Sequence, residues 1–270
     1  MAPIRWGVPG PHLVRREARA GALHACDYSR QLWRSALSAE VAELYDRKIT
    51  SVTAYPVVVF DLDGTLLRGT SVSLMLAEWL GRTTEMAELE RAFHVHEISN
   101  SIVADISAGW FAGQRTVDVW RVLAEGPWIA GMAETFQTLT ASGASILLGT
   151  ITWSFAAEML QELYGFAAVS GTEMQAPGGV LSGTVNRYFD EHDKARFVEE
   201  WCVQGGYSMS QVAAVGDSRS DIPLFRRAGL SIALNATADA QEAATHVLDT
   251  DDLRDVLGLL GSPAAISGTE

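Results

Sequence analysis

Short apolar runs alternate with amphipathic stretches along most of the chain, starting near residue 55. The runs are rich in β-branched residues and end at Gly, Asp or Ser, as buried strands do. We expect strands at 57–60, 145–149, 212–215, 230–234 and 246–248. Helical periodicity between them predicts helices at 153–164, 194–203 and 221–228. This alternation predicts an α/β fold with a doubly wound parallel sheet.

One long stretch, residues 68–135, has no clear strand and shows helical periodicity, as in "SVSLMLAEWLG" and "RTVDVWRVLAEG". A connection of this length is too long for a simple crossover between neighbouring strands. We therefore expect a helical cap inserted after the first strand. Large aromatic residues within it are expected to form its core or to line a pocket: Trp79, Trp110, Phe111, Trp120 and Trp128.

The pattern divides the chain into three parts. Residues 55–67 and 136–262 would form the core, and 68–135 the cap. Residues 1–54 begin with a Pro- and Gly-rich stretch and continue as a polar helical extension, with Leu37, Val41, Leu44 and Tyr45 on one helix face. We expect this extension to pack on the main domain. The alternative is an arm that makes a homo-oligomer or holds a partner.

Composition excludes several classes of protein. The chain has 270 residues, 48% of them hydrophobic, which is normal for a packed globular protein. Its net charge of −13 argues against binding nucleic acid, whose phosphates need a basic surface. The sequence shows neither a run of about 18 apolar residues nor a secretory signal, so we expect a cytoplasmic protein that spans no membrane. Cys26 and Cys202 are too few for a disulfide framework or a zinc cluster.

Candidate chemistry follows the first predicted strand, in "FDLDGT". Asp61 and Asp63 come where the strand breaks into a loop at Gly64, so both carboxylates can aim at one point beyond its end. Two such carboxylates repel each other unless a cation joins them. The alternative for an isolated Asp-x-Asp-Gly is an ordinary turn.

Three further strand or helix ends carry suitable residues, and ligands bind at the carboxyl ends of parallel strands. "SILLGTITWSF" places Thr150 where a strand gives way to a helix, although Thr there is often only a cap. "FDEHDKARFVEEW" places Lys194 near a helix start, although a single Lys is usually solvated. "VAAVGDSRSDIPLFRRAG" places Asp217 after a buried strand, with Asp221 following it.

These four elements, in this order, resemble the motifs of the haloacid dehalogenase superfamily of hydrolases, in its phosphoserine-phosphatase-like branch. "FDLDGTLL" matches the first motif residue for residue, "AVGDSRSDIPLFRRAG" matches the fourth closely, and "GGVLSGTV" resembles a hairpin of this branch. The second motif falls on Thr150 by its distance to Gly165, with Thr152 as the fallback. The third falls on Lys194. The resemblance implies a Rossmann-like core with a cap.

The resemblance also implies a phosphatase acting on a small phosphorylated metabolite. Asp61 would attack phosphorus to give an aspartyl-phosphate, which divides one hard displacement into two easier ones. Asp63 would protonate the leaving group and then deprotonate the attacking water. Lys194 and Thr150 would bind phosphoryl oxygens, with Thr152 as an additional binding residue.

The implied cofactor is Mg²⁺, an ion that prefers oxygen ligands. It would be held by the Asp61 side chain, the Asp63 backbone carbonyl and Asp217, with Asp221 orienting a metal-bound water. A phosphate dianion could then approach the carboxylates.

The cap departs from the pattern of phosphoserine phosphatases, which carry a Glu after the first motif and an Arg further along. Thr70 occupies the position of that Glu, and "IVADISAGWFAG" offers no Arg. Glu97 or Arg115 could substitute. Residues around Trp110 and Phe111 favour a less charged leaving group, such as a sugar, cyclitol or polyol. We therefore expect a substrate other than phosphoserine.

Two alternative functions stay open. A phosphotransferase or mutase would share every motif and would differ in whether water reaches the intermediate. A non-catalytic phosphate-binding protein would be expected to have lost a catalytic position, yet Asp61, Asp63, Lys194 and Asp217 are all present. A dehalogenase has no need of an acid at Asp63.

Overall fold

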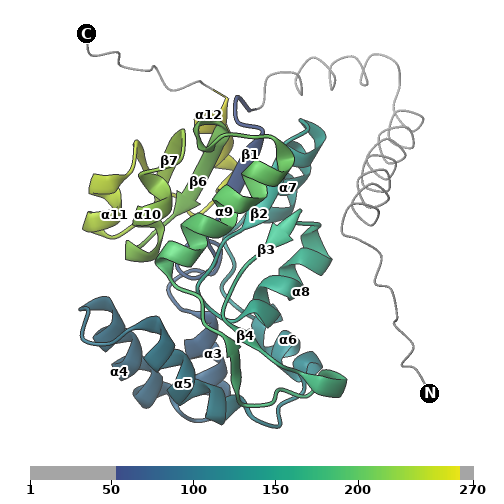
Figure 1. The fold of residues 1–270 in the computed structure, drawn as a ribbon, viewed down its shortest axis with the longest axis vertical. Coiled ribbons are helices and arrows are strands. Elements are labelled where there is room, and N and C mark those ends of the chain that lie inside the picture. Colours follow the sequence, from purple (N-terminus) through teal and green to yellow (C-terminus); the bar gives the residue numbers. More distant parts are fainter. Residues whose placement is uncertain (1–52, 262–270) are drawn as a thin grey trace, which may run out of the picture. The chain divides into compact units, whose positions relative to one another are not determined.

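The computed structural model of the chain describes residues 53–261, and Figure 1 shows their arrangement. The predicted helix face at Leu37–Tyr45, the oligomer arm and Cys26 lie outside the described residues. In this part of the chain, every helix falls short of the length and apolar character that a bilayer crossing requires.

Six strands of the described region form one parallel sheet in the order β3-β2-β1-β6-β7-β8. The predicted doubly wound, Rossmann-like α/β fold is confirmed. The five predicted strands are present with ends within one residue, and β3 is an additional strand of two residues, too short to leave a pattern. The bounds are β1 Val57–Phe60, β2 Ser145–Leu148, β3 Ala168–Val169, β6 Val212–Gly216, β7 Leu230–Leu234 and β8 His246–Leu248.

Successive residues of the central strand face opposite layers of helices. Val58 and Phe60 join the hydrophobic cluster on one face, and Val57 and Val59 join the cluster on the other. Burial on both faces explains why the strand is a continuous apolar run. One face is covered by α7 (Met132–Ala141), α8 (Ser154–Tyr164) and α12 (Val256–Leu260), the other by α9 (Glu191–Gly205), α10 (Ile222–Phe225) and α11 (Ala238–Ala243).

Two helices differ from the predicted ranges. Helix α9 begins at Glu191, before the predicted start, because the Asp190 carboxylate caps it by accepting from the His192 and Asp193 N–H groups, both at 2.8 Å. Helix α10 ends at Phe225, because the chain then turns toward β7. Four short 3-10 turns complete the described elements: η1 Pro177–Gly179, η2 Met209–Gln211, η3 Arg219–Asp221 and η4 Leu253–Asp255.

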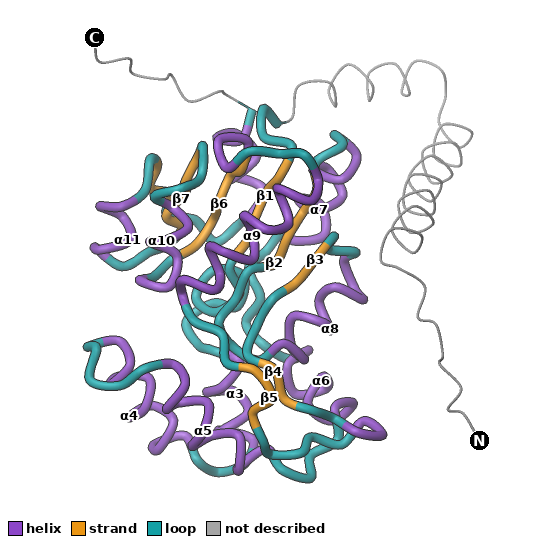
Figure 2. The backbone as a smooth tube through the Cα atoms, in the orientation of Figure 1, coloured by secondary structure: helices purple, strands orange, loops and turns teal. Residues whose placement is uncertain are grey.

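A group of helices, here called the helical insertion, lies between β1 and α7 in the chain. It comprises α3 (Val72–Trp79), α4 (Thr83–His94), α5 (Asn100–Phe111) and α6 (Thr116–Ala124). A hairpin of β4 (Glu173–Met174) and β5 (Val185–Arg187) lies beside it (Figure 2). Its loop is joined to the insertion because the Leu181 N–H donates to the Gln114 carbonyl at 2.8 Å.

The chain enters and leaves the helical insertion at one place. The Arg68 N–H donates to the Pro127 carbonyl and the Ile129 N–H donates to the Leu66 carbonyl, both at 2.9 Å. The two connecting segments are therefore paired side by side next to the end of β1.

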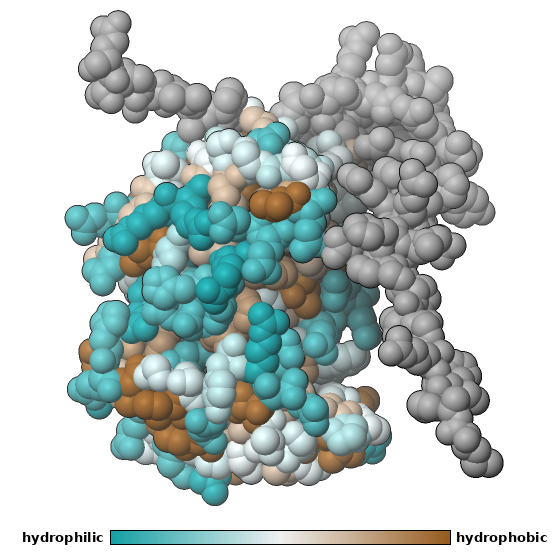
Figure 3. Space-filling model, viewed as in Figure 1, coloured by the Kyte–Doolittle hydropathy of each residue, from teal (hydrophilic) through white to brown (hydrophobic). Residues whose placement is uncertain are grey.

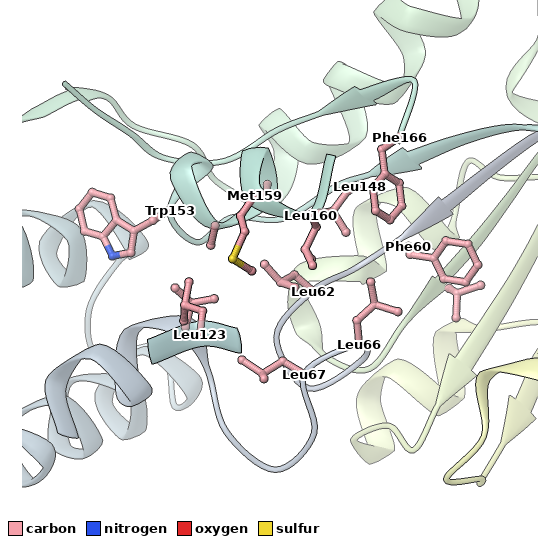
Figure 4. Packing of buried hydrophobic residues seen from close by; sticks show 14 of the residues in the cluster. Phe60, Leu62, Leu66, Leu67, Leu123, Leu148, Trp153, Met159, Leu160 and Phe166 are labelled. Atoms are coloured by element: carbon pink, nitrogen blue, oxygen red, sulfur yellow. The ribbon is translucent and has the colours of Figure 1, made fainter. Parts of the chain in front are cut away.

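Apolar packing continues from the sheet into the helical insertion (Figure 4). Leu62, Leu66 and Leu67, just beyond β1, contact the same buried cluster as Leu123 of α6 and Met159 of α8. The Trp120 indole N–H also donates to the Phe155 carbonyl at 3.1 Å. Figure 3 shows apolar side chains on the outer surface of the insertion over α4 and α5.

Candidate active site

Asp61 and Asp217 follow adjacent strands of the sheet. β1 pairs with β2 on one side and with β6 on the other, so the order of the strands reverses at β1. The carboxyl ends of parallel strands meet at one edge, and the point of reversal opens a crevice there. Asp61, Asp217 and Asp221 each offer a carboxylate oxygen, and these oxygens lie within 4.8 Å of one another. The structure therefore brings the first and fourth motifs together.

Lys194 is the cation of this cluster and is fully buried. Its Nζ donates to Asp61 Oδ1 at 2.6 Å and to Asp221 Oδ1 at 2.5 Å. Burial alone would lower the Lys194 pKa, but the charges of Asp221 and Asp61 raise it above its ordinary value. Lysine is almost never fully buried unless it is paired. Here two carboxylates are its partners.

The pKa values of the two first-motif carboxyls are raised. Burial raises the pKa of Asp61 to about 6, against the opposing effect of Lys194. Burial raises the pKa of Asp63 to about 8, although the Val72 N–H donates to its Oδ1 at 2.8 Å and opposes the rise. Val72 is the first residue of α3, so this carboxyl faces a helix N-terminus, where N–H groups favour negative charge.

The fourth-motif carboxylates are held by the loop around them. The Thr65 hydroxyl donates to Asp217 Oδ1 at 3.0 Å, and burial raises the Asp217 pKa well above its usual range. Asp221 Oδ2 accepts from the N–H groups of Asp217 and Ser218, at 3.0 and 3.2 Å. With Lys194 on its other oxygen, Asp221 lies behind Asp217 and fixes its loop.

Gly64 is the residue that lets these carboxylates approach. Its φ is +82°, in the left-handed region that favours glycine. A Cβ at this position would lie 2.2 Å from Asp217 Oδ2, which is closer than atoms can approach. The Gly of "DLDGT" therefore serves two purposes, the turn and the close contact.

A cavity of about 330 Å³ opens above the carboxylates. Its wall includes Asp61, Asp63 and Asp217 from the strand ends and residues of α3, α4 and α5 from the helical insertion. Lys194 and Asp221 lie behind this wall.

The predicted threonines all line the cavity: Thr70, Thr150 and Thr152. The Thr150 N–H donates to the Ser170 hydroxyl at 3.2 Å, and the Thr152 N–H donates to Thr150 Oγ1 at 3.3 Å. The Thr152 side chain opposes the rise in the Asp63 pKa, so it lies close to that carboxyl. The first choice for the second motif and its fallback thus lie beside each other, each in contact with the site.

Glu97 and Arg115, which could substitute for the missing cap Glu and Arg, do not line the cavity. Glu97 pairs with Arg91 at 3.3 Å on the surface, and Arg115 lies 3.9 Å from Asp118, also at the surface. Phe111 is buried against Trp153, with ring centroids 5.7 Å apart. Trp110 has the Arg82 guanidinium 5.0 Å from its ring. Neither aromatic residue lines the cavity, but Val103, Ala104 and Ser107 of the same helix do, so the less charged leaving group stays a prediction.

Sequence reasoning missed several wall residues: Ser71, Glu90, His94, Asn100, Thr172, Ser218 and Ser220. Asn100, at the start of α5, donates from Nδ2 to the carbonyls of Ile151 and Phe189, at 3.0 and 2.8 Å. It joins the helical insertion to the core. Asn near a helix start is usually interpreted as a capping residue, so the sequence does not predict this contact.

Solved structures with similar folds were found. The chain resembles a phospho-aspartyl intermediate analogue of phosphoserine phosphatase, with a TM-score of 0.68, 21% identity and coverage of 76% of this chain and 99% of the other. A haloacid dehalogenase family hydrolase from Salmonella enterica serovar Typhi gives a TM-score of 0.71 at 16% identity, over 84% of this chain and 82% of the other.

Curated relatives are named phosphoserine phosphatases. The Streptomyces coelicolor protein is 29% identical over 84% of this chain and 57% of its own length. SerB2 of Mycobacterium tuberculosis is 30% identical over 76% of this chain and 50% of its own length. An Archaeoglobus fulgidus protein is 27% identical over 77% of this chain and 60% of its own length. The matches thus span 50% to 60% of these three relatives.

The model of the family described as haloacid dehalogenase-like hydrolase matches residues 58–226. This range contains the candidate residues of all four motifs, from Asp61 to Asp221, and the whole helical insertion. The chain belongs to the haloacid dehalogenase-like hydrolase family.

Proposed function

We propose that this protein is a Mg²⁺-dependent phosphatase that hydrolyses a small-molecule phosphomonoester through an aspartyl-phosphate on Asp61. The observation that carries the proposal is the position of Lys194, fully buried with its Nζ 2.6 Å from Asp61 Oδ1, directly beneath a cavity of about 330 Å³. A carboxylate held by a buried cation at a cavity wall is poised as a nucleophile.

The donor set fits a magnesium ion. Asp61 and Asp217 offer carboxylate oxygens close together at the cavity wall, and the Asp63 carbonyl is the third proposed ligand. Bound there, Mg²⁺ would neutralise phosphate charge and polarise the phosphoryl oxygens. Asp221 is proposed to act from behind, by holding Lys194 and the 216–218 loop.

The reaction would then proceed in two displacements. Asp61 Oδ attacks phosphorus, the bond from phosphorus to the leaving oxygen breaks, and the Asp63 carboxyl gives its proton to that oxygen. Water next attacks phosphorus while Asp63 takes a proton from it, and the Asp61–phosphorus bond breaks to release inorganic phosphate. Thr150 and Thr152 would bind the phosphoryl oxygens during both steps, while Lys194 would offset the charge of Asp61 from behind the wall.

The helical insertion would act as the cap that closes this site. We keep residues 68–135 as the proposed cap and 55–67 with 136–262 as the proposed core. A cap that admits water gives a phosphatase, and one that excludes it gives a phosphotransferase or mutase, so the latter is the alternative activity.

The test is phosphate release from a panel of phosphorylated metabolites with and without Mg²⁺. Asp61→Asn keeps the volume but removes the nucleophilic charge, and we expect it to lower turnover at least about 10³-fold. Asp217→Asn should raise the Mg²⁺ concentration needed for half-maximal activity. An active Asp61→Asn protein would contradict the covalent route. Loss of the phosphoryl group from the donor only when an acceptor alcohol is added, with formation of a new phosphate ester instead of inorganic phosphate, would favour the transferase.

A further inference from the structure

The ionisable groups of the cavity wall are almost all acidic. In the described part of the chain, the wall holds the carboxyls of Asp61, Asp63, Asp217 and Glu90, and it includes no Lys or Arg. Lys194 is committed to Asp61 and Asp221 behind the wall. Away from the proposed Mg²⁺ ligands, a substrate carboxylate would therefore lose its water without gaining a Lys or Arg partner, which is costly for a buried charge.

Glu90 brings its charge from the helical insertion. It lies on α4, and its Oε1 accepts from the hydroxyl of Ser71, the N-cap residue of α3. Among residues 53–261, its Oε2 has no hydrogen-bond partner. Its carboxyl is near enough to Asp63 to raise the Asp63 pKa. Glu90 thus lies at the end of the cavity that the leaving group would occupy, with one oxygen free to accept a hydrogen bond.

The neighbouring histidine does not reverse this polarity. His94 lies four residues after Glu90, on the same face of α4, and also lines the cavity. Partial burial and the charge of Arg219 lower the His94 pKa, which favours the neutral ring. A neutral imidazole can hydrogen bond to a hydroxyl or an amine but gives a carboxylate no charge.

We propose that Glu90 is the specificity-determining residue of this cavity, where it accepts a hydrogen bond from an ammonium or hydroxyl group of a leaving group without a carboxylate. The inference rests on the proposed function. Recognition of the leaving group was expected at Thr70. The inference places it instead at Glu90, on α4. It also gives the Glu90 carboxyl a second partner, because the substrate itself supplies the donor.

The experiment compares four substrates: phosphoethanolamine for the ammonium, glycerol 3-phosphate for the hydroxyl, and phosphoserine and 3-phosphoglycerate for the carboxylate. Each kcat/KM is divided by that for p-nitrophenyl phosphate, whose leaving group has no donor. We expect at least one of the first two ratios to exceed both carboxylate ratios about tenfold. Glu90→Gln should lower that ratio about tenfold, and Glu88→Gln, on the exposed side of α4, should leave it unchanged.

A binding experiment distinguishes failure of this inference from failure of the proposed function. The same four compounds are titrated against the Asp61→Asn protein with Mg²⁺, and their shifts in melting temperature are compared with and without Glu90→Gln. A preference for phosphoethanolamine or glycerol 3-phosphate that Glu90→Gln abolishes supports the assignment, even if no compound is hydrolysed. A preference for a carboxylate compound, or a preference that Glu90→Gln leaves intact, overturns it.

Discussion

The Arg219 guanidinium donates to the Phe93 carbonyl at 2.9 Å and lies 4.2 Å from the centre of the Phe93 ring. Arg219 belongs to the loop between the two fourth-motif carboxylates, whereas Phe93 is near the end of α4 in the helical insertion. The same guanidinium donates to Glu191 Oε1 at 3.0 Å, at the start of the helix that carries Lys194. One side chain therefore links the proposed metal-binding loop, the insertion and α9.

Arg219→Gln should weaken closure of the helical insertion over the cavity. Charged hydrogen bonds contribute about 1.5–3 kcal/mol when they are sheltered from water. We expect KM to rise about tenfold, with a smaller change in kcat, measured by steady-state kinetics on the best substrate of the panel. Arg227→Gln is the control, since Arg227 pairs with Glu199 at 2.5 Å and neither residue belongs to the helical insertion. An unchanged KM in Arg219→Gln would show that this contact does not hold the insertion.

Lys194→Met should destabilise the protein, because it leaves Asp61 and Asp221 buried without their cation. Removing one partner of a buried ion pair costs about 3–5 kcal/mol. The Asp61 pKa is already raised to about 6, above its value in the unfolded chain, and losing Lys194 raises it further. Protonation in the folded state therefore relieves the repulsion as pH falls. The loss in melting temperature without metal should be larger at pH 8 than at pH 5.

Arg196→Met serves as the control for Lys194, because Arg196 is exposed on the same helix. It should lower the melting temperature by little at either pH. A loss in Lys194→Met that is equal at pH 5 and pH 8 would contradict the charge argument.

Asp63→Asn should stabilise the metal-free protein at alkaline pH. The Asp63 pKa is about 8 in the folded state, against an ordinary value of 3.8, so folding favours the protonated form. Stability from this group is present at low pH and falls as pH rises from about 4 to 8. Asn stays neutral and can still accept from Val72. With a chelator at pH 8 its melting temperature should exceed that of the unmodified protein by at least about 2–4 °C, which corresponds to about 1 kcal/mol.

The difference between Asp63→Asn and the unmodified protein should shrink when the pH is lowered to 4, where both side chains are neutral. Melting curves recorded by circular dichroism in chelator at several pH values give this comparison. A difference that grows on acidification would reverse the assigned direction of the pKa shift.

Gly64→Ala should impair metal binding more than backbone strain explains. Gly69→Ala is a close control, because Gly69 also has a positive φ, +66°, but a Cβ there meets nothing within 4 Å. Both variants carry the strain of a left-handed alanine, about 1–2 kcal/mol. Only Gly64→Ala pushes on the Asp217 carboxylate. We expect it alone to raise the Mg²⁺ requirement, about tenfold or more, in activity titrations; equal effects of the two variants would exclude the contact.

The sequence allowed the sheet and most of the carboxylate cluster to be predicted, for one physical reason. Strands buried on both faces, such as Val57–Phe60, are continuous apolar runs that are easy to recognise. Residues that follow such strands meet at one edge of the sheet. The sequence alone therefore predicts that Asp61 and Asp217 lie close together.

The cavity wall on the insertion side could not be predicted, because it depends on how helices dock. Glu90 and His94 occupy positions on an amphipathic helix that would normally face water, and nothing local distinguishes them from Glu88. Phe111 is buried, as expected of a core aromatic, but the sequence does not say which residues it packs against. The complete burial of Lys194 could not be predicted either, since a single lysine is usually solvated.

The paired segments at Arg68–Pro127 and Leu66–Ile129 imply that recognition and chemistry can change separately. The two ends of the insertion are fixed next to each other, so the loop-closure entropy of the helices between them depends only weakly on their number and length. Asp61, in contrast, follows a strand that is hydrogen bonded on both sides. A fold built this way can exchange the helices of the insertion while the carboxylates proposed for catalysis stay at the same edge of the sheet.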